Sequence, residues 1–372
     1  MRPIVMVDLH SQYMAIKNDI DAAIQRVIDS TQFIKGQEVE AFEQELADYL
    51  NIPHVISCAN GTDALMISLR ALGIQPGDEV IVPTFTFIAS AEVITLLGAV
   101  PVFADIDPDT FNIDTRQVES LITPRTRAIM PVHLFGLCAD MEKIMHLAQK
   151  HNLYVIEDVA QALGATCNYN GKACKAGTIG HIAATSFFPS KNLGCFGDGG
   201  AIFTRDATLA YKARLIANHG AEKKYYHLMP GVNSRLDALQ AAILRVKLPH
   251  LDEYISKRQA AAMQYHKLLA EVKSIQLPVS TPSHTFNQYT LIVKNGQRNT
   301  LQHYLQEKKI PTAIYYPVPL HLQPAFSYLK YSEGSFPVAE RLSHQVISLP
   351  MHTELDEEQI GYIAKSVRDF LF

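Results

Sequence analysis

The stretch "VIEDVAQALGA", residues 155–165, begins with apolar residues, continues with two acidic residues and ends in a segment rich in small residues. Together with Leu153 and Tyr154 the run reads "LYVIED", without the apolar–polar alternation of a strand that has one face in water. An unbroken apolar run of this length is typical of a strand buried on both faces, as in a parallel sheet covered by helices. We therefore predict a central strand that ends at Asp158.

Similar short runs occur on both sides of this stretch. They are "HVISCA" (54–59), "EVIVP" (79–83), "PVFADI" (101–106), "RAIMPVH" (127–133), "AATSFF" (183–188) and "GAIFT" (200–204). Helix-like stretches separate most of them, and this alternation indicates an α/β fold. The sequence predicts a mostly parallel seven-stranded sheet in a large domain.

The pattern changes after the long helical stretch that covers residues 234–272. One strand-like run, "FNQYTLIVK", and helical stretches at 298–309 and 356–371 follow it. We predict a large domain over residues 1–248 and a smaller C-terminal α/β domain over 249–372. Whether the N-terminal segment packs on the small domain stays open.

Composition excludes several classes of function. The 372 residues carry a formal net charge of -4 and no cluster of Lys and Arg, so no nucleic-acid partner is expected. No apolar run reaches the roughly 18 residues of a membrane span, and no signal peptide is recognisable. Five cysteines without a CxxC pair predict reduced thiols in a cytoplasmic protein. The 15 histidines form no HExxH motif, so no metal site is expected.

Residues suited to ligand binding lie at or after the ends of several predicted strands. They are Gly61 and Thr62 after the first strand, Phe87 after the second, His133 after the fourth, Asp158 and Gln161 after the fifth, and Ser186 and Lys191 after the sixth. Ligands of open α/β sheets bind at the carboxyl ends of the strands. Each residue also has an ordinary explanation: a tight turn at Gly61, a helix cap at Asp158, a core aromatic at Phe87.

Taken together, these residues meet the requirements of pyridoxal 5′-phosphate. A helix N-terminus beginning at Gly61 and the hydroxyl of Ser186 can hold a phosphate. A carboxylate such as Asp158 can pair with a pyridinium nitrogen, and Lys191 can form an imine with the cofactor's aldehyde.

The chain also resembles the nucleotide-sugar aminotransferases, DegT/StrS-like members of the aspartate-aminotransferase-like (fold type I) pyridoxal-phosphate enzymes. The resemblance rests on these stretches, which run in order through most of the chain: "NGTDAL" (60–65), "GDEVIVPTFTFIAS" (77–90), "PVFADIDPDTFNID" (101–114), "PVHLFG" (131–136), "VIEDVAQALGA" (155–165), "SFFPSKNLGCFGDGGA" (186–201), "HGAEKKYYHLMPGVNSRLDALQAAIL" (219–244) and "YYPVPLHLQPAF" (315–326).

The resemblance implies a role for each cofactor residue. Lys191 is similar to the Schiff-base lysine, and Asp158 to the partner of the pyridine nitrogen. Gln161 corresponds to a donor to the ring hydroxyl, and Phe87 to the residue that covers the ring. Three residues correspond to phosphate ligands: Gly61, Thr62 and Ser186. Asn233 is similar to an asparagine that reaches the partner subunit's phosphate, which implies a homodimer with shared active sites.

The resemblance also implies the reaction. L-glutamate is the expected amino donor, and a 3-keto sugar on dTDP or UDP is the expected acceptor, in the biosynthesis of surface polysaccharides or glycoconjugates. Candidates for contacts with the sugar nucleotide are Tyr225, His227, Arg235 and His321. For His321, packing within its loop is an equal alternative, and His133 could simply bond backbone groups.

Three other functions fit parts of the pattern. Sugar dehydratases share the fold and cofactor but replace the lysine, so Lys191 argues against that class. A 4-keto sugar aminotransferase would carry the same cofactor residues. A regulatory protein that binds pyridoxal phosphate without turnover would also retain the pocket.

Overall fold

Seven strands form the central sheet of the computed structural model, which describes residues 2–371. They are β1 (His54–Cys58), β2 (Glu79–Pro83), β3 (Val100–Ala104), β4 (Thr126–Ile129), β5 (Tyr154–Asp158), β8 (Ile182–Ser186) and β9 (Gly200–Thr204). Their order across the sheet is β1-β9-β8-β5-β4-β2-β3. All neighbours pair in parallel except β9, which is antiparallel to both β1 and β8. The predicted mostly parallel seven-stranded sheet is confirmed.

Two separate hydrophobic clusters cover the two faces of this sheet. Val155 belongs to one cluster and its neighbour Ile156 to the other, because successive side chains of a strand point to opposite faces. Helices α3 (Gln37–Leu50), α7 (Met141–His151) and α9 (Ala238–Lys247) contribute to the first cluster, and α4 (Gly61–Ala71), α5 (Ala89–Leu96) and α8 (Ala207–Ala217) to the second. Burial on both faces explains why the strands lack alternation.

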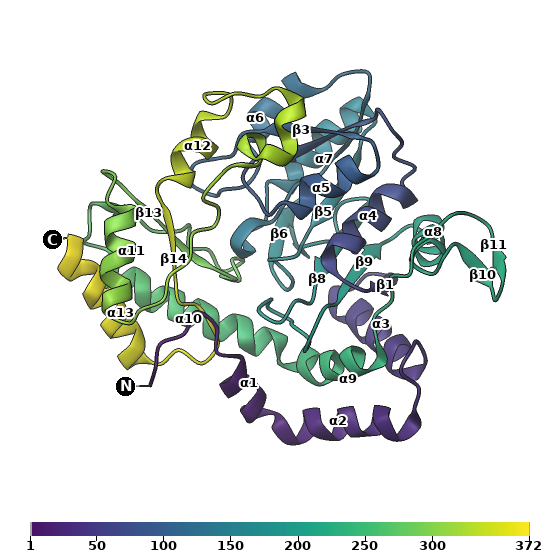
Figure 1. The fold of residues 1–372 in the computed structure, drawn as a ribbon, viewed down its shortest axis with the longest axis horizontal. Coiled ribbons are helices and arrows are strands. Elements are labelled where there is room, and N and C mark those ends of the chain that lie inside the picture. Colours follow the sequence, from purple (N-terminus) through teal and green to yellow (C-terminus); the bar gives the residue numbers. More distant parts are fainter. Residues whose placement is uncertain (1, 372) are drawn as a thin grey trace.

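The C-terminal part has its own core around a second sheet. Its strands are β12 (Ile275–Gln276), β13 (Tyr289–Val293) and β14 (Val346–Leu349), and its helices are α10 (Leu251–Leu269), α11 (Arg298–Glu307) and α13 (Glu357–Leu371). The N-terminus reaches this part, since Arg2 forms a salt bridge with Asp356 at 3.1 Å. Helices α1 (Leu9–Ala15) and α2 (Lys17–Ser30) then lead back to α9 (Figure 1).

A later segment returns from the small sheet to the large one. The ring of Phe326 packs edge-on against Phe103 of β3, with centroids 5.4 Å apart. Helix α12 (Pro337–Ser343) begins on the buried carboxylate of Asp105, which accepts hydrogen bonds from the N–H groups of Val338 and Ala339 at 3.0 and 2.9 Å. A division after residue 248 therefore leaves part of the C-terminal segment packed on the large domain's core, and the domain boundary stays a prediction.

The prediction of a single long helix over residues 234–272 is wrong. Helix α9 ends at Lys247, a 3-10 turn spans Leu248–His250, and α10 begins at Leu251. Pro249 lies in this turn. Proline has no N–H to donate and its ring collides with the preceding turn of a helix, so the helix breaks there.

Two hairpins and several short turns were not predicted from the sequence. One hairpin pairs β6 (Thr166–Tyr169) with β7 (Lys172–Lys175); the other pairs β10 (Ala221–Lys223) with β11 (Tyr226–His227). The second hairpin projects from the body of the molecule beside α8, at the right of Figure 1. The remaining short elements are α6 (Thr115–Val118) and 3-10 turns at Glu119–Leu121, Leu134–Gly136, Leu320–Leu322 and Pro324–Leu329.

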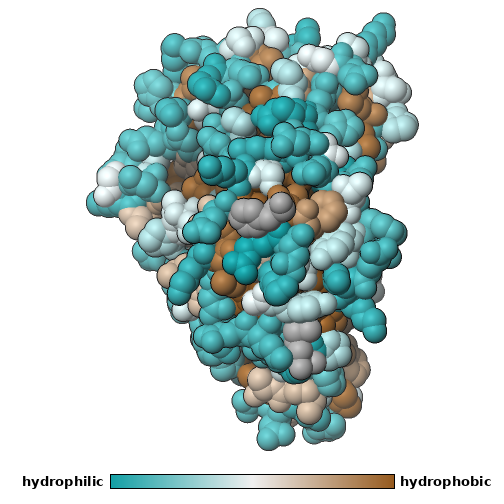
Figure 2. Space-filling view, turned by 90° about the vertical axis from the view of Figure 1, so that its left-hand side faces the viewer, coloured by the Kyte–Doolittle hydropathy of each residue, from teal (hydrophilic) through white to brown (hydrophobic). Residues whose placement is uncertain are grey.

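Figure 2 shows the side of the molecule that carries the small sheet and its helices. Hydrophilic residues cover most of this side, and hydrophobic ones are visible mainly in recesses between them. Within residues 2–371, none of the helices combines the length and the apolar character that crossing a bilayer requires.

Candidate active site

A cavity of about 830 Å³ opens at the carboxyl ends of the central strands. Seven of the residues predicted for the cofactor line it: Gly61, Thr62, Phe87, Asp158, Gln161, Ser186 and Lys191. They come from the ends of three strands, β2, β5 and β8, and from the helix that follows β1. The topology thus brings together side chains that lie up to 130 positions apart in the chain (191 − 61).

The N-terminus of α4 forms one wall of the cavity. Asn60 caps this helix, because its Oδ1 accepts a hydrogen bond from the N–H of Asp63 at 2.8 Å. A Cβ atom at Gly61 would lie 2.7 Å from the Cβ of Ser186, so only glycine leaves room beside Ser186. Free N–H groups of a helix N-terminus, next to a hydroxyl, form a site suited to a phosphate.

Asp158 lies at the end of β5 and is only 5% exposed. Its Oδ2 accepts a hydrogen bond from Ser90 Oγ at 2.8 Å, and its Oδ1 accepts one from the N–H of Ala160 at 3.1 Å. Burial raises the pKa of Asp158, although these two hydrogen bonds and the charge of Lys191 act in the opposite direction. A buried carboxylate that lines a cavity and makes no salt bridge within residues 2–371 is suited to a cationic ligand group.

Lys191 lies in the loop after β8 and lines the same cavity. Burial lowers the pKa of its amine, and the neighbouring Asp158 carboxylate opposes this shift. A lowered pKa increases the fraction of neutral amine, the form that attacks a carbonyl carbon. The amine is therefore prepared for imine chemistry.

The loop that carries Lys191 is tightly folded. The N–H of Cys195 donates to the carbonyl oxygen of Phe187 at 2.8 Å, and a Cβ at Gly194 would lie 2.3 Å from the carbonyl oxygen of Pro189. Lys247 Nζ, on α9, donates to the carbonyl oxygen of Gly194 at 2.5 Å. Burial lowers the pKa of Lys247 to about 8. These contacts fix the position from which Lys191 reaches into the cavity.

Gln161 is held in one orientation by a backbone group. Its Oε1 accepts a hydrogen bond from the N–H of Phe135 at 2.7 Å, and its Nε2 donates to the hydroxyl of Tyr316 at 3.1 Å. The ring of Phe87 lies 6.5 Å from that of Tyr316 and is 55% exposed, at the cavity wall. Phe87 is thus available to cover a flat ligand.

Sequence reasoning missed Ser90 and Tyr316. Both lie inside stretches that carry the family resemblance, "GDEVIVPTFTFIAS" and "YYPVPLHLQPAF". Nothing in their spacing indicates that Ser90 meets Asp158, 68 positions away, or that Tyr316 meets Gln161, 155 positions away. Only the packing of separate segments produces these contacts.

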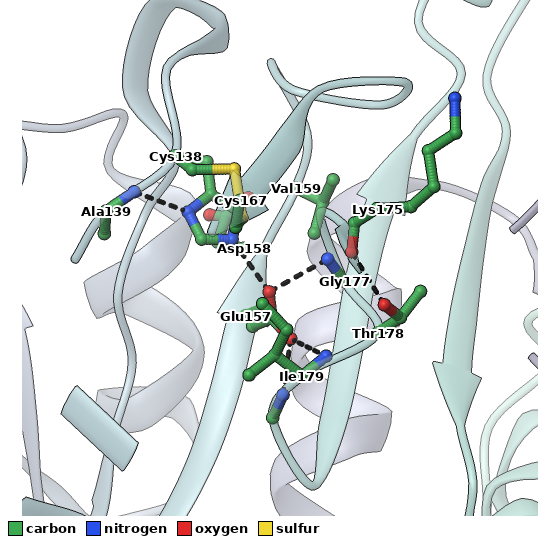
Figure 3. A network of polar contacts seen from close by, with 12 residues as sticks. Cys138, Ala139, Glu157, Asp158, Val159, Cys167, Lys175, Gly177, Thr178 and Ile179 are labelled. Carbon is green, nitrogen blue, oxygen red and sulfur yellow. Dashed lines mark hydrogen bonds and ion pairs between the residues drawn. A yellow bond between two sulfur atoms is a disulfide. The ribbon is translucent and has the colours of Figure 1, made fainter. Parts of the chain in front are cut away.

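Glu157, next to Asp158 in sequence, forms a fully buried hydrogen-bonded pair with His133. Glu157 accepts hydrogen bonds from the N–H groups of Gly177, Ile179 and Gly180, and from His133 Nε2 at 2.9 Å (Figure 3). His133 Nδ1 accepts the N–H of Ala139 at 3.1 Å, which assigns the ring proton to Nε2. Burial alone would raise the pKa of Glu157, but His133 and the backbone N–H groups outweigh it and lower the pKa.

The prediction of five reduced thiols is wrong for two cysteines, because a disulfide joins Cys138 to Cys167 (Figure 3). Cys138 lies in the loop before α7 and Cys167 on strand β6, 29 positions apart in sequence, and α7 and β6 are in contact. Cys58, Cys174 and Cys195 are free. The two bridged sulfurs and His133 lie within 4.8 Å of one another, but the sulfurs bond each other and both ring nitrogens are engaged. This cluster is therefore not arranged to bind a metal ion.

The other predicted residues lie outside the cavity. Tyr225 and His227 are exposed on the β10–β11 hairpin, and Asn233 is exposed beyond it. Arg235 lines a second hollow of about 350 Å³. His321 is 2% exposed, with Nδ1 2.8 Å from Thr84 Oγ1 and Nε2 3.0 Å from Glu340 Oε1. This geometry favours the packing role that the sequence left open for His321.

Known proteins share both the sequence and the fold. Residues 14–368 match the model of the DegT/DnrJ/EryC1/StrS aminotransferase family. A "UDP-2-acetamido-2-deoxy-3-oxo-D-glucuronate aminotransferase" of Pseudomonas aeruginosa is 48% identical over 98% of this chain and 99% of that protein. A "Pleiotropic regulatory protein" of Geobacillus stearothermophilus is 49% identical over 98% of each chain.

A solved structure agrees with this result. The crystal structure of S. venezuelae DesV in complex with a ketimine intermediate superposes with a TM-score of 0.95. It is 43% identical and covers 100% of this chain and 99% of that one. The predicted fold class is confirmed.

Proposed function

Because the chain belongs to the DegT/DnrJ/EryC1/StrS aminotransferase family, we propose that it transfers an amino group from L-glutamate to a 3-keto sugar carried on UDP or dTDP. Members of this family are pyridoxal-phosphate-dependent aminotransferases. Relatives of this chain are named as aminotransferases of UDP- and dTDP-linked sugars. The observation that carries the proposal is the meeting of Lys191 and Asp158 in one cavity beside the N-terminus of α4.

The residues of the cavity fit pyridoxal phosphate. Gly61, Thr62 and Ser186 would hold the phosphate, because the space beside Ser186 admits no Cβ and the helix offers free N–H groups. Asp158 would face the ring nitrogen, where a cation would lower the pKa that burial now raises. When bound, the cofactor supplies an aldehyde for imine formation and a ring that accepts electron density.

The residues of this chain then move the protons. Lys191 would bind the aldehyde covalently and, once the substrate's amino group displaces it, its neutral amine would take the proton from the substrate's Cα. Asp158 would keep the ring nitrogen protonated. The loop contacts of Gly194 and Lys247 would hold the amine within reach of that carbon.

Position C3 is favoured by the relatives' names. Proteins 47% and 44% identical are named "UDP-N-acetyl-3-dehydro-alpha-D-glucosamine 3-aminotranferase" and "dTDP-3-amino-3,4,6-trideoxy-alpha-D-glucose transaminase". A "GDP-perosamine synthase" is less similar, at 39% identity. The proposal includes a role in surface polysaccharide or glycoconjugate biosynthesis and a cytoplasmic location.

A homodimer with shared active sites belongs to the same proposal. Tyr225 is 80% and Tyr226 61% exposed on the projecting hairpin, and Asn233 is exposed nearby. These residues do not reach their own chain's cavity, but a second copy could receive them. Arg235 would likewise reach the cavity of the second copy and bind the sugar nucleotide's diphosphate or the donor's carboxylate there. Mixed dimers of Lys191→Ala and Asn233→Ala subunits should regain activity, because one site per dimer keeps both residues.

A regulatory protein without turnover is the second candidate, since a relative 49% identical is named "Pleiotropic regulatory protein". An assay of 2-oxoglutarate formation from L-glutamate, with a panel of UDP- and dTDP-linked 3-keto and 4-keto sugars, separates the candidates. Turnover with a 3-keto sugar supports the proposal. Cofactor binding without turnover on any sugar supports the regulator.

A further inference from the structure

We propose that Tyr316 is a positioning residue of the cofactor site, which acts through the side-chain amide of Gln161. Tyr316 lies in the loop before the 3-10 turn Leu320–Leu322, within the predicted small domain, whereas Gln161 follows strand β5. The inference rests on the proposed function, because it assigns Tyr316 a task in binding the same cofactor.

The side-chain amide of Gln161 is held in one orientation. The N–H of Phe135 donates to Oε1 at 2.7 Å, so the oxygen is already engaged and the amide cannot turn over without losing this bond. The NH2 group therefore points the other way, toward the hydroxyl of Tyr316 at 3.1 Å. Of the two protons on Nε2, one bonds Tyr316 and the second remains for a ligand in the cavity that Gln161 lines.

The ring of Tyr316 is held in place by two neighbouring aromatic rings. Its ring packs edge-on against Phe85 with centroids 5.9 Å apart, and tilted against Phe87 at 6.5 Å. Phe85 is fully buried. Contact with two rings restricts the motion of the phenol, so its oxygen stays beside the Gln161 amide and favours one direction of its N–H groups.

The hydroxyl of Tyr316 is uncharged. Burial raises the pKa of Tyr316 far above its ordinary value, so the phenol stays neutral at any working pH. A neutral phenol accepts the hydrogen bond from Gln161 at every such pH, so the pair presents one donor, the second N–H of Gln161, to an oxygen of the ligand.

This N–H matters because the cofactor, when bound, would supply a ring oxygen with negative charge, and a donor from the protein stabilises such a charge. With a weaker donor, the bound cofactor should lose its proton at a higher pH. Other charged groups that line the cavity are Asp63, Asp158, Lys191 and Asp198, and the proposed variants leave them all in place.

The test is a spectrophotometric pH titration of the cofactor-loaded protein. For Tyr316→Phe, which keeps the ring, the pH at which the visible absorption band of the bound cofactor changes should rise by roughly 0.5 to 1 unit. The matched control is Tyr315→Phe, since Tyr315 also lines the cavity but makes no hydrogen bond to Gln161. Its titration should coincide with that of the wild type.

A double-mutant cycle then shows whether Tyr316 acts through Gln161. In a Gln161→Ala background, Tyr316→Phe should shift the titration by less than half as much as in the wild type. An unchanged titration in Tyr316→Phe, or an equal shift with and without Gln161, would overturn the inference while leaving the proposed function intact. If the wild-type protein binds no pyridoxal phosphate at all, the proposed function fails and the inference fails with it.

Discussion

Ser90 Oγ donates a hydrogen bond to Asp158 Oδ2 at 2.8 Å, and both side chains are buried. Ser90 lies on α5 and Asp158 at the end of β5, so the bond joins two elements at the floor of the cavity. Together with the N–H of Ala160, it fixes both carboxylate oxygens. The carboxylate that is proposed to face the ring nitrogen is thus oriented before any ligand arrives.

Ser90→Ala should weaken pyridoxal-phosphate binding by about 5- to 30-fold, because a hydrogen bond to a charged group is worth roughly 1–2 kcal/mol here. Fluorescence titration of the apoprotein with the cofactor measures this loss. Ser90→Thr, which keeps the hydroxyl, should bind within about twofold of the wild type. Equal affinity in the Ala variant would mean that Asp158 needs no support from α5.

Glu157→Ala should lower the free energy of unfolding by about 3–5 kcal/mol, because it leaves His133 and three backbone N–H groups without their buried acceptor. Urea denaturation followed by circular dichroism gives the value. Glu119→Ala is the control: this carboxylate pairs with Lys150 and His151 at the surface, and its removal should leave the free energy of unfolding nearly unchanged. A loss of similar size in both variants would contradict the importance of the buried pair.

Cys138 and Cys167 should appear as one linked peptide pair in a non-reduced digest, leaving three of the five cysteines to react with a thiol reagent under denaturing conditions. Replacing both by serine should lower the free energy of unfolding by about 2–4 kcal/mol, because the bridge closes a loop of sequence separation 29. Five reactive thiols in protein isolated without reductant would instead match the reduced state first expected.

Stability should fall as the pH decreases from about 6.5 to about 4, in part because of His352. This side chain is 3% exposed, and burial lowers its pKa to about 4. In this window the unfolded chain binds a proton at His352 and the folded chain does not, so unfolding is favoured by up to about 1.4 kcal/mol per pH unit.

His352→Asn offers the control for this pH effect. Asparagine can still accept the N–H of Glu354, which His352 Nδ1 accepts at 3.2 Å, but it does not titrate. Its free energy of unfolding should vary less steeply between pH 4 and 6.5. Parallel curves for the two proteins would show that His352 does not contribute to acid unfolding.

The sequence predicted the sheet because its strands are buried on both faces, which leaves unbroken apolar runs such as "HVISCA" and "EVIVP". It also predicted that Asp158 and Lys191 would meet in one cavity, since Asp158 ends one strand, Lys191 follows another, and strand ends converge at one edge. Ser90, Tyr316 and the disulfide depend instead on how distant segments pack. No spacing rule reaches across the 155 positions between Gln161 and Tyr316.

The helix break at Pro249 could have been predicted, because proline inside a helical pattern indicates a break. The long amphipathic stretch on both sides of Pro249 favoured one continuous helix instead. The solvent exposure of the Tyr225 side chain could not be predicted from the sequence. An aromatic residue at a hairpin tip looks the same in sequence whether it contacts its own chain or a second copy.

The central claim is that Lys191 performs the chemistry of amino transfer. The most direct test mixes cofactor-loaded protein with L-glutamate, without a sugar acceptor, and follows 2-oxoglutarate and the visible band of the cofactor in a single turnover. The wild type should release a stoichiometric burst of 2-oxoglutarate as the band disappears, and Lys191→Ala should slow this step by roughly a thousandfold or more while remaining folded. A Lys191→Ala variant that turns over at the wild-type rate would contradict the account.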